Sequence, residues 1–377
     1  MIKSMVKHTR SELKSLRRFA SDRVVKRLVL IVVLFVVLGT GVVRVAKKRV
    51  EDTLVEQVLH REQVVVKAGA EEISGFLKLI GKSLAFLAED VDHILAGGEE
   101  TQAILDSFIA KWKDTPLVEV AVIDEKGIVQ LVANKQKTGM KKGISTVDRD
   151  YFIAAKEVEP GKVFVGRPIL PRLGAYEGQY IISLTTPIYD KGKFKGVLGS
   201  AILLSELVKS YIDPLRISGD TRAYLLNSDG LFLHMPFPDL VGVNLFDHLD
   251  TNRFLGSEWL VAKIKEKMSR IKEEGEGTLV YMEPGFDDKK IRTTMLLAYF
   301  LVDVGDRDWI LAVGTPKEDA LVFMVPFHEN LVMILGLMSL VILGSVALML
   351  LIWRLVQREA YEDGFKAGKR YWKRKVK

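Results

Sequence analysis

Two long stretches without a charged residue constrain this chain more than any other feature of its sequence. Residues 28–43 read LVLIVVLFVVLGTGVV, and residues 331–353 form a second uncharged run. About 20 apolar residues in a helix span the hydrocarbon core of a bilayer, and Arg44 can extend the first run by placing its charge at the interface. We therefore predict transmembrane helices over residues 28–46 and 325–353.

A cleavable signal peptide is the alternative for the first stretch, because a basic region precedes it. That region is 27 residues long, however, and RVAKKR follows the apolar run where a small-residue cleavage site would stand. We favour an uncleaved anchor.

Lysine and arginine are concentrated in the two tails. Residues 1–27 carry a net charge of +7 and residues 354–377 carry +6, whereas the whole chain carries +7, so the segment between the tails is acidic. Basic segments stay inside the cell. We expect a two-pass protein of the inner (plasma) membrane with both termini in the cytoplasm, although four basic residues after the first span oppose this orientation. We expect the tails to rest on lipid headgroups and not to bind nucleic acid.

An amphipathic helix is predicted directly after the first span. Apolar residues recur mostly at three- and four-residue steps from Val50 to Leu95, and Gly97-Gly98 ends the pattern. A helix over these residues is about 70 Å long. We expect it to form a stalk whose apolar stripe packs on itself in a homodimer.

Two similar hairpin patterns follow, and they indicate an internal duplication. VEVAVIDEKGIVQLVAN and TRAYLLNSDGLFLHMPF turn at Gly127 and Gly230, which are 103 residues apart. Each is followed by helical stretches, YFIAAKEV and SELVKSYIDPL in the first copy and EWLVAKIKEKMSRIKEE in the second. Each copy also has two more strands, which predicts an α+β fold with two tandem antiparallel sheets.

The predicted division has seven segments. They are a basic cytoplasmic tail (1–27), the first transmembrane helix (28–46), the stalk (47–98), a membrane-distal first module (99–213), a membrane-proximal second module (214–324), the second transmembrane helix (325–353) and a basic cytoplasmic tail (354–377).

The order of stalk, DRDYFIAA, SLTTPIYDKGKFKGVLGSAILLSEL and AYLLNSDGLFLHMPFPDLVGVNL, ahead of a strand that enters a membrane helix, resembles a double Cache (dCache) domain. The resemblance covers roughly residues 47–320. It implies two PAS-like modules outside the cytoplasm, of the kind found in chemoreceptors and sensor kinases.

The sequence offers little to an enzyme. Its six histidines are scattered, it has no cysteine, and it lacks the HExxH, GxSxG and GxxxxGK patterns. No enzymatic activity, cofactor or metal site is expected.

The run DRDYF is the candidate ligand site. The resemblance implies that Arg149 holds a carboxylate and that Tyr151 and Phe152 close the pocket, with Arg167 and Tyr180 as further candidates. A guanidinium forks two donors onto a carboxylate, and aromatic faces cover an apolar or cationic group. In the alternative, the two rings are core residues at a helix start and Arg149 pairs with a neighbouring aspartate.

Ala201 bears on the choice of ligand. In the resembled family, receptors of amino acids have an aspartate at this place, which anchors the ammonium group. Its replacement by Ala201 favours a small organic acid over an amino acid.

Only 24 residues follow Trp353, so we expect a ligand sensor that has no output domain and signals through a cytoplasmic or membrane partner. A truncated chemoreceptor remains open, as does a structural or assembly protein that uses a PAS-like ectodomain for protein contacts.

Overall fold

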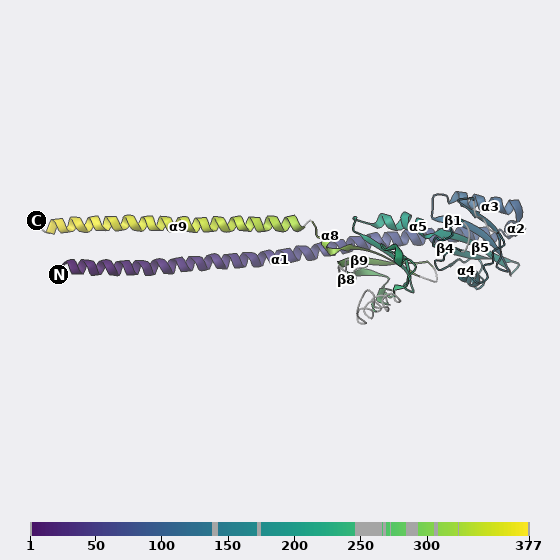
Figure 1. Ribbon diagram of the computed structural model, residues 1–377, viewed down its shortest axis with the longest axis horizontal. Coiled ribbons are helices and arrows are strands. Elements are labelled where there is room, and N and C mark those ends of the chain that lie inside the picture. The colour runs from purple at the N-terminus through teal and green to yellow at the C-terminus, as the bar shows by residue number, and fades with distance from the viewer. Residues whose placement is uncertain are drawn as a thin grey trace. The chain divides into compact units, whose positions relative to one another are not determined.

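The computed structural model describes residues 2–137, 142–171, 175–245, 266, 269–271, 273–283, 293–304, 308–322 and 324–375. The chain divides into two compact units, one formed by residues 1–54 and 321–377 and the other by residues 55–320. The first unit contains the long helical ends of the chain, and the second contains both β-sheets (Figure 1).

Helix α1 (Ile2–Glu89) takes in the first predicted span and most of the predicted stalk without interruption. Its buried apolar side chains recur at three- and four-residue steps: Val66, Ala70, Ile73, Leu77, Ile80 and Leu84. They form one core cluster with residues of both sheets. From Val66 to Leu84 the chain's own sheets therefore cover the stripe, so this part of it is not available to a second copy. The homodimer stays a prediction.

The predicted stalk helix is interrupted at Asp90, directly after the end of α1, but the predicted break at Gly97-Gly98 is present. Helix α2 (Val91–Ala96) ends at Gly97, whose φ of +72° suits a residue without a side chain. The chain then continues directly into an unpredicted helix, α3 (Gly98–Lys111), which packs on β1 and β2.

Each half of the duplication forms a five-stranded antiparallel sheet. The first contains β1 (Leu117–Asp124), β2 (Val129–Asn134), β3 (Phe164–Val165), β4 (Ile181–Asp190) and β5 (Lys193–Leu203), in the order β2-β1-β5-β4-β3. The second contains β6 (Arg222–Asn227), β7 (Phe232–His234), β8 (Glu276–Glu283), β9 (Thr293–Val302) and β10 (Trp309–Pro316), in the order β7-β6-β10-β9-β8. The identical order confirms the predicted duplication, although β3 and β8 were not predicted.

Both predicted hairpin turns are present. The amide of Gly127 donates to the carbonyl of Asp124 at 2.9 Å, and the amide of Gly230 donates to that of Asn227 at 3.0 Å. Both glycines have φ above +75°, where a side chain would be strained.

The remaining helices are short, apart from the last. They are α4 (Asp150–Ala155), α5 (Leu204–Leu207), the π-helical turn η1 (Val208–Ile212), the 3-10 turns η2 (Asp213–Leu215) and η3 (Pro238–Leu240), α8 (Lys317–Ala320) and α9 (Met324–Lys375). The first four confirm helical structure over YFIAAKEV and SELVKSYIDPL. The helix predicted over residues 258–274 lies mostly outside the described residues.

The two faces of the first sheet have different roles, because successive side chains on a strand alternate in direction. One face, including Val120, Leu184 and Ile202, joins the core cluster with α1. A register shift in β1 between Leu117 and Glu119 breaks the alternation. Leu117 and Val120 therefore both belong to that core. Glu119 alternates with Val120 in the ordinary way and faces the opposite side, where the candidate site lies.

Among the described residues, no helix is both long and apolar enough to cross a membrane. The two predicted spans, residues 28–46 and 325–353, lie within α1 and α9 and stay predictions.

Candidate functional site: a pocket on the first sheet

A cavity of about 120 Å³ lies on the face of the first sheet that points away from α1. The strands contribute Glu119, Ser183, Thr185 and Ala201 to its wall, and the segments that cover the sheet contribute Thr146, Arg149, Tyr151 and Ile169. The cavity therefore combines an apolar sheet surface with a few polar groups, which is the usual composition of a small-molecule site.

The backbone conformation of Arg149 places this residue at the start of α4. It is the N-cap residue, with φ −83° and ψ 137°, and its carbonyl accepts hydrogen bonds from the amides of Phe152 and Ile153. Its side chain is half-buried and lines the cavity. Among the described residues, no carboxylate forms an ion pair with Arg149. A half-buried guanidinium without a carboxylate partner is suited to binding an anion.

The carboxylate of Asp150 accepts hydrogen bonds from two backbone amides. Its Oδ1 accepts a hydrogen bond from the amide of Tyr151 at 2.8 Å, and its Oδ2 accepts one from the amide of Arg167 at 3.3 Å. The aspartate therefore ties the start of α4 to the segment that follows β3, and its carboxylate is not the partner of Arg149.

Tyr151 lines the cavity next to Arg149. Its carbonyl accepts a hydrogen bond from the hydroxyl of Thr185 at 3.2 Å, which attaches α4 to β4. Burial raises the pKa of the Tyr151 phenol to about 12, although Arg149 and a hydrogen bond with Thr146 act in the opposite direction. The ring is therefore a neutral wall that can stack on a ligand or donate a hydrogen bond.

Phe152 lies in the core beneath the cavity. Its side chain is fully buried and contacts the ring of Phe194 edge-on at a centroid distance of 6.4 Å. The ammonium group of Lys156 lies 4.5 Å from the centre of the Phe152 ring. This position corresponds to the alternative interpretation of the sequence for this ring, a core residue at a helix start.

Arg167 and Tyr180 lie where the two modules meet. The Nη2 of Arg167 is 3.3 Å from the Oδ2 of Asp229, in the hairpin turn of the second module. The Tyr180 hydroxyl lies against the backbone of Gly242, where an added Cβ would come within 2.1 Å of it. The structure therefore brings Arg149, Tyr151 and Ala201 together in the cavity and places these two candidates in contact with the other module.

Glu119 is a pocket residue that was not predicted from the sequence. It is the cross-strand neighbour of Ala201 in the β1–β5 pairing. Burial raises the pKa of its carboxyl to about 7, while a hydrogen bond with the Asn134 side chain lowers it. Its one signal in the sequence is a carboxylate between the apolar residues of LVEVAVI, ahead of the turn at Asp124. The pocket thus contains a carboxyl group beside the position that Ala201 leaves without one.

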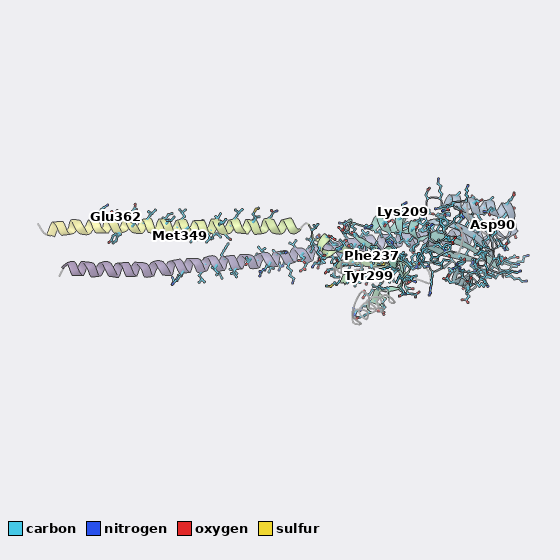
Figure 2. The ribbon with its side chains drawn as sticks, viewed as in Figure 1. Asp90, Lys209, Phe237, Tyr299, Met349 and Glu362 are labelled. Carbon is cyan, nitrogen blue, oxygen red and sulfur yellow. The ribbon has the colours of Figure 1, made fainter. Side chains whose placement is uncertain are left out.

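The equivalent face of the second sheet is filled by its own side chains. Tyr224, Leu226, Leu297, Tyr299 and Ile310 form a cluster there, with Phe237 packed against it. Tyr299 and Phe237 are labelled in Figure 2. Within the described residues, the comparable cavity therefore belongs to the first module.

Metal ligands are not gathered at this site. In the part of the chain that the structure describes, no group of three or more histidine or carboxylate side chains is arranged to hold a metal ion.

Several solved structures share this fold. The ligand-binding domain of the Pseudomonas fluorescens chemoreceptor CtaA in complex with L-serine is 16% identical over 70% of this chain and 99% of that one, with a TM-score of 0.50. A protein described as methyl-accepting chemotaxis protein X is 14% identical over 71% and 99%, with a TM-score of 0.54. An extracellular ligand-binding receptor from Desulfohalobium retbaense is 16% identical, with a TM-score of 0.49. The match covers 67% of this chain and 39% of that receptor.

At these identities the first two structures establish the fold alone. No curated protein sequence gives a significant match. A family model for the Cache domain, dCache_1, matches residues 50–322, which take in α1 from its stalk region onward and both sheets. With the duplicated sheet order and this match, the chain belongs to the double Cache family of sensor domains.

Proposed function

We propose that this chain is a membrane-anchored sensor whose first module binds a small carboxylate ligand, and that Arg149 holds the carboxylate. One observation carries the proposal: Arg149 lines a cavity and has no ion-pair partner among the described residues. Arginine has five donors and no acceptor, so a half-buried guanidinium is best satisfied by an anion. The cavity of about 120 Å³ limits that anion to a small molecule.

The carboxyl group of Glu119 limits which chemical group the ligand can carry at the end opposite its carboxylate. A pocket with a guanidinium and a carboxyl group accepts a carboxylate that also carries a hydrogen-bond donor, such as a hydroxyl or ammonium group. The absence of a charge at Ala201 therefore does not by itself disfavour an amino acid, and the related CtaA domain was solved with L-serine. The carboxylate is the chemistry that organic acids, hydroxy acids and amino acids share.

The test measures binding to the full-length chain in detergent or nanodiscs. A panel of organic acids, hydroxy acids and amino acids is screened by thermal shift, because a ligand of the folded state raises the melting temperature. Positive compounds are then titrated by calorimetry into wild type, Arg149→Ala and Arg167→Ala.

Arg149→Ala is expected to weaken binding about 30- to 1,000-fold, since losing a charge-assisted partner costs about 2–4 kcal/mol. Arg167→Ala is the matched control, because Arg167 pairs with Asp229 and lies outside the cavity wall. Unchanged affinity in Arg149→Ala, or an equal loss in the control, would contradict the proposed role of Arg149.

The proposed anchoring uses residues 28–46 and 325–353, with both termini in the cytoplasm and the Cache domain outside. Large apolar side chains are exposed on both segments, including Leu34 and Leu38 on α1 and Leu340 and Leu348 on α9. Exposed apolar surface of this kind suits lipid better than water. A reporter fused after Lys377 should be active in the cytoplasm, and one inserted in the Lys191-Gly192 turn should be active outside.

We also propose that the sensor works as a homodimer and passes its signal to a cytoplasmic or membrane partner. The apolar side chains available to a second copy are those on the outward side of α1, where Leu79 and Phe86 are 53% and 78% exposed. Phe86 borders a groove between α1 and α3 that Phe108 and Trp112 also line. No enzymatic activity is proposed.

A further inference from the structure

Glu62 occupies a position that a charged side chain rarely takes. Among the buried residues that the structure describes, it is the only carboxylate, and no lysine, arginine or histidine is buried with it. Its side chain is fully buried, and neither carboxyl oxygen has a hydrogen-bond partner in the described part of the chain. A buried ionised carboxylate without partners is costly, so such a group tends to stay neutral.

The location of Glu62 follows from the periodicity of α1. It lies four residues before Val66 and eight before Ala70, on the same stripe that packs on the sheets. The carboxyl group thus occupies a core position of the helix at the point where α1 meets the last strand of the second sheet.

Thr315 of β10 faces Glu62. Its hydroxyl and its backbone are close enough to lower the pKa of the carboxyl group, although neither forms a hydrogen bond of good geometry with it. Its hydroxyl is already hydrogen-bonded to that of Thr221 at 3.1 Å, and both threonines are buried. Arg61, on the same helix, is the charged residue that lowers the pKa of Glu62, and β10 contributes no charged side chain to this contact.

The strand on the other side of this contact, β10, is the last strand of the sensor domain. Thr315 is the second-last residue of β10, and after Pro316 the chain passes through α8 (Lys317–Ala320) into α9 from Met324. Any change in how α1 holds the end of β10 therefore acts on the strand that continues into α9.

We propose that Glu62 is a proton-controlled contact between α1 and the end of β10, docked when its carboxyl is neutral and released when it is ionised. This contact makes the output of the protein depend on pH, independently of any ligand in the first module. It goes beyond the proposed function and does not rest on it.

The direction of the effect follows from linkage. Burial raises the pKa of Glu62 from its ordinary value of 4.5 to about 8, and Thr315 and Arg61 offset only part of that effect. The docked state therefore binds the proton more tightly than the released state. Docking is strongest below about pH 4.5, weakens roughly tenfold per pH unit up to about pH 8, and is constant above that.

The test is hydrogen exchange of the full-length chain in phospholipid nanodiscs at several pH values from 5.5 to 8.5, corrected for intrinsic exchange rates. Peptides that cover β10 and α8 report the contact. In wild type their protection is expected to fall on the order of 100-fold across this range. In Glu62→Gln, which keeps the size of the side chain but cannot ionise, the protection should not change with pH.

Glu71→Gln is the matched control, because Glu71 is an exposed glutamate on the same helix and should leave the wild-type profile unchanged. If Glu62→Gln fails to fold, Glu62→Met provides a second side chain without a charge, with the same expectation. The proposal would be overturned if protection of these peptides changed with pH in the Glu62 variant as it does in wild type. A constant difference in protection between the two proteins at every pH would indicate a merely structural role and would also overturn it.

Discussion

Replacing Phe152 separates a core residue from a ligand contact. The ring is fully buried, lies edge-on to Phe194 at 6.4 Å and has the ammonium group of Lys156 at 4.5 Å. Truncating a buried phenylalanine to alanine costs about 3–5 kcal/mol, and the two ring contacts belong to that loss. For a unit of this size, each kcal/mol lowers the melting temperature by about 2–4 °C. Phe152→Ala should therefore melt roughly 6–20 °C below wild type.

Thermal unfolding of the full-length chain, followed by circular dichroism, measures this shift. Tyr151→Ala is the matched variant, because Tyr151 lines the cavity and is only partly buried. It should melt closer to wild type but lose affinity for any ligand found by the panel. A Phe152→Ala protein that melts within 2 °C of wild type and no longer binds would refute the assignment of Phe152 to the core.

Three further predictions concern the pocket, the fold and the assembly. Because the pKa of Glu119 is raised from 4.5 to about 7, wild type loses stability as pH rises through that window. Glu119→Gln should match wild type near pH 4 and exceed its free energy of unfolding by roughly 2–3 kcal/mol at pH 8, and denaturant titrations with equal differences at both pH values would count against this. At Gly196 an added Cβ would lie 2.1 Å from the carbonyl oxygen of Ile123, so Gly196→Ala should destabilise the first module by several kcal/mol and be detected as lost expression or a lowered melting temperature. Since the chain has no cysteine, Phe86→Cys alone should crosslink a dimer in membranes, whereas Leu84→Cys at a buried position should not, and the reverse pattern would place the interface elsewhere.

Much of the fold could be predicted because local sequence patterns determine it. The turn glycines Gly127 and Gly230 and the alternation beside them identify both hairpins, and their spacing reveals the duplication. The covering of the α1 stripe could not be predicted, since an apolar stripe looks the same whether its partner is the same chain or a second copy. The family match over residues 50–322 agrees with the predicted extent of the sensor domain.

The pocket was predicted only in part, for geometric reasons. Successive helical residues differ by about 100° in direction, so Tyr151 can face the cavity while Phe152 enters the core, although the motif treats them as a pair. Glu119 lies on the same face of β1 as Ala121 and Ile123, which also line the cavity. Both faces of this strand carry apolar side chains, so its alternation does not show which face meets the core.

The shared core of α1 and the two sheets also sets an order for folding during synthesis. Gly81, in the later part of α1, lies against Val163, which is 82 residues further along the chain. Ser74, in the earlier part, donates a hydrogen bond to the carbonyl of Asp303, which is 229 residues away. The part of the stripe that is synthesised first is therefore the last to be covered by the sheets. Contacts between residues so distant in sequence also form slowly. Until β10 leaves the ribosome, that stretch is the surface of the nascent chain most exposed to misassociation and to chaperones.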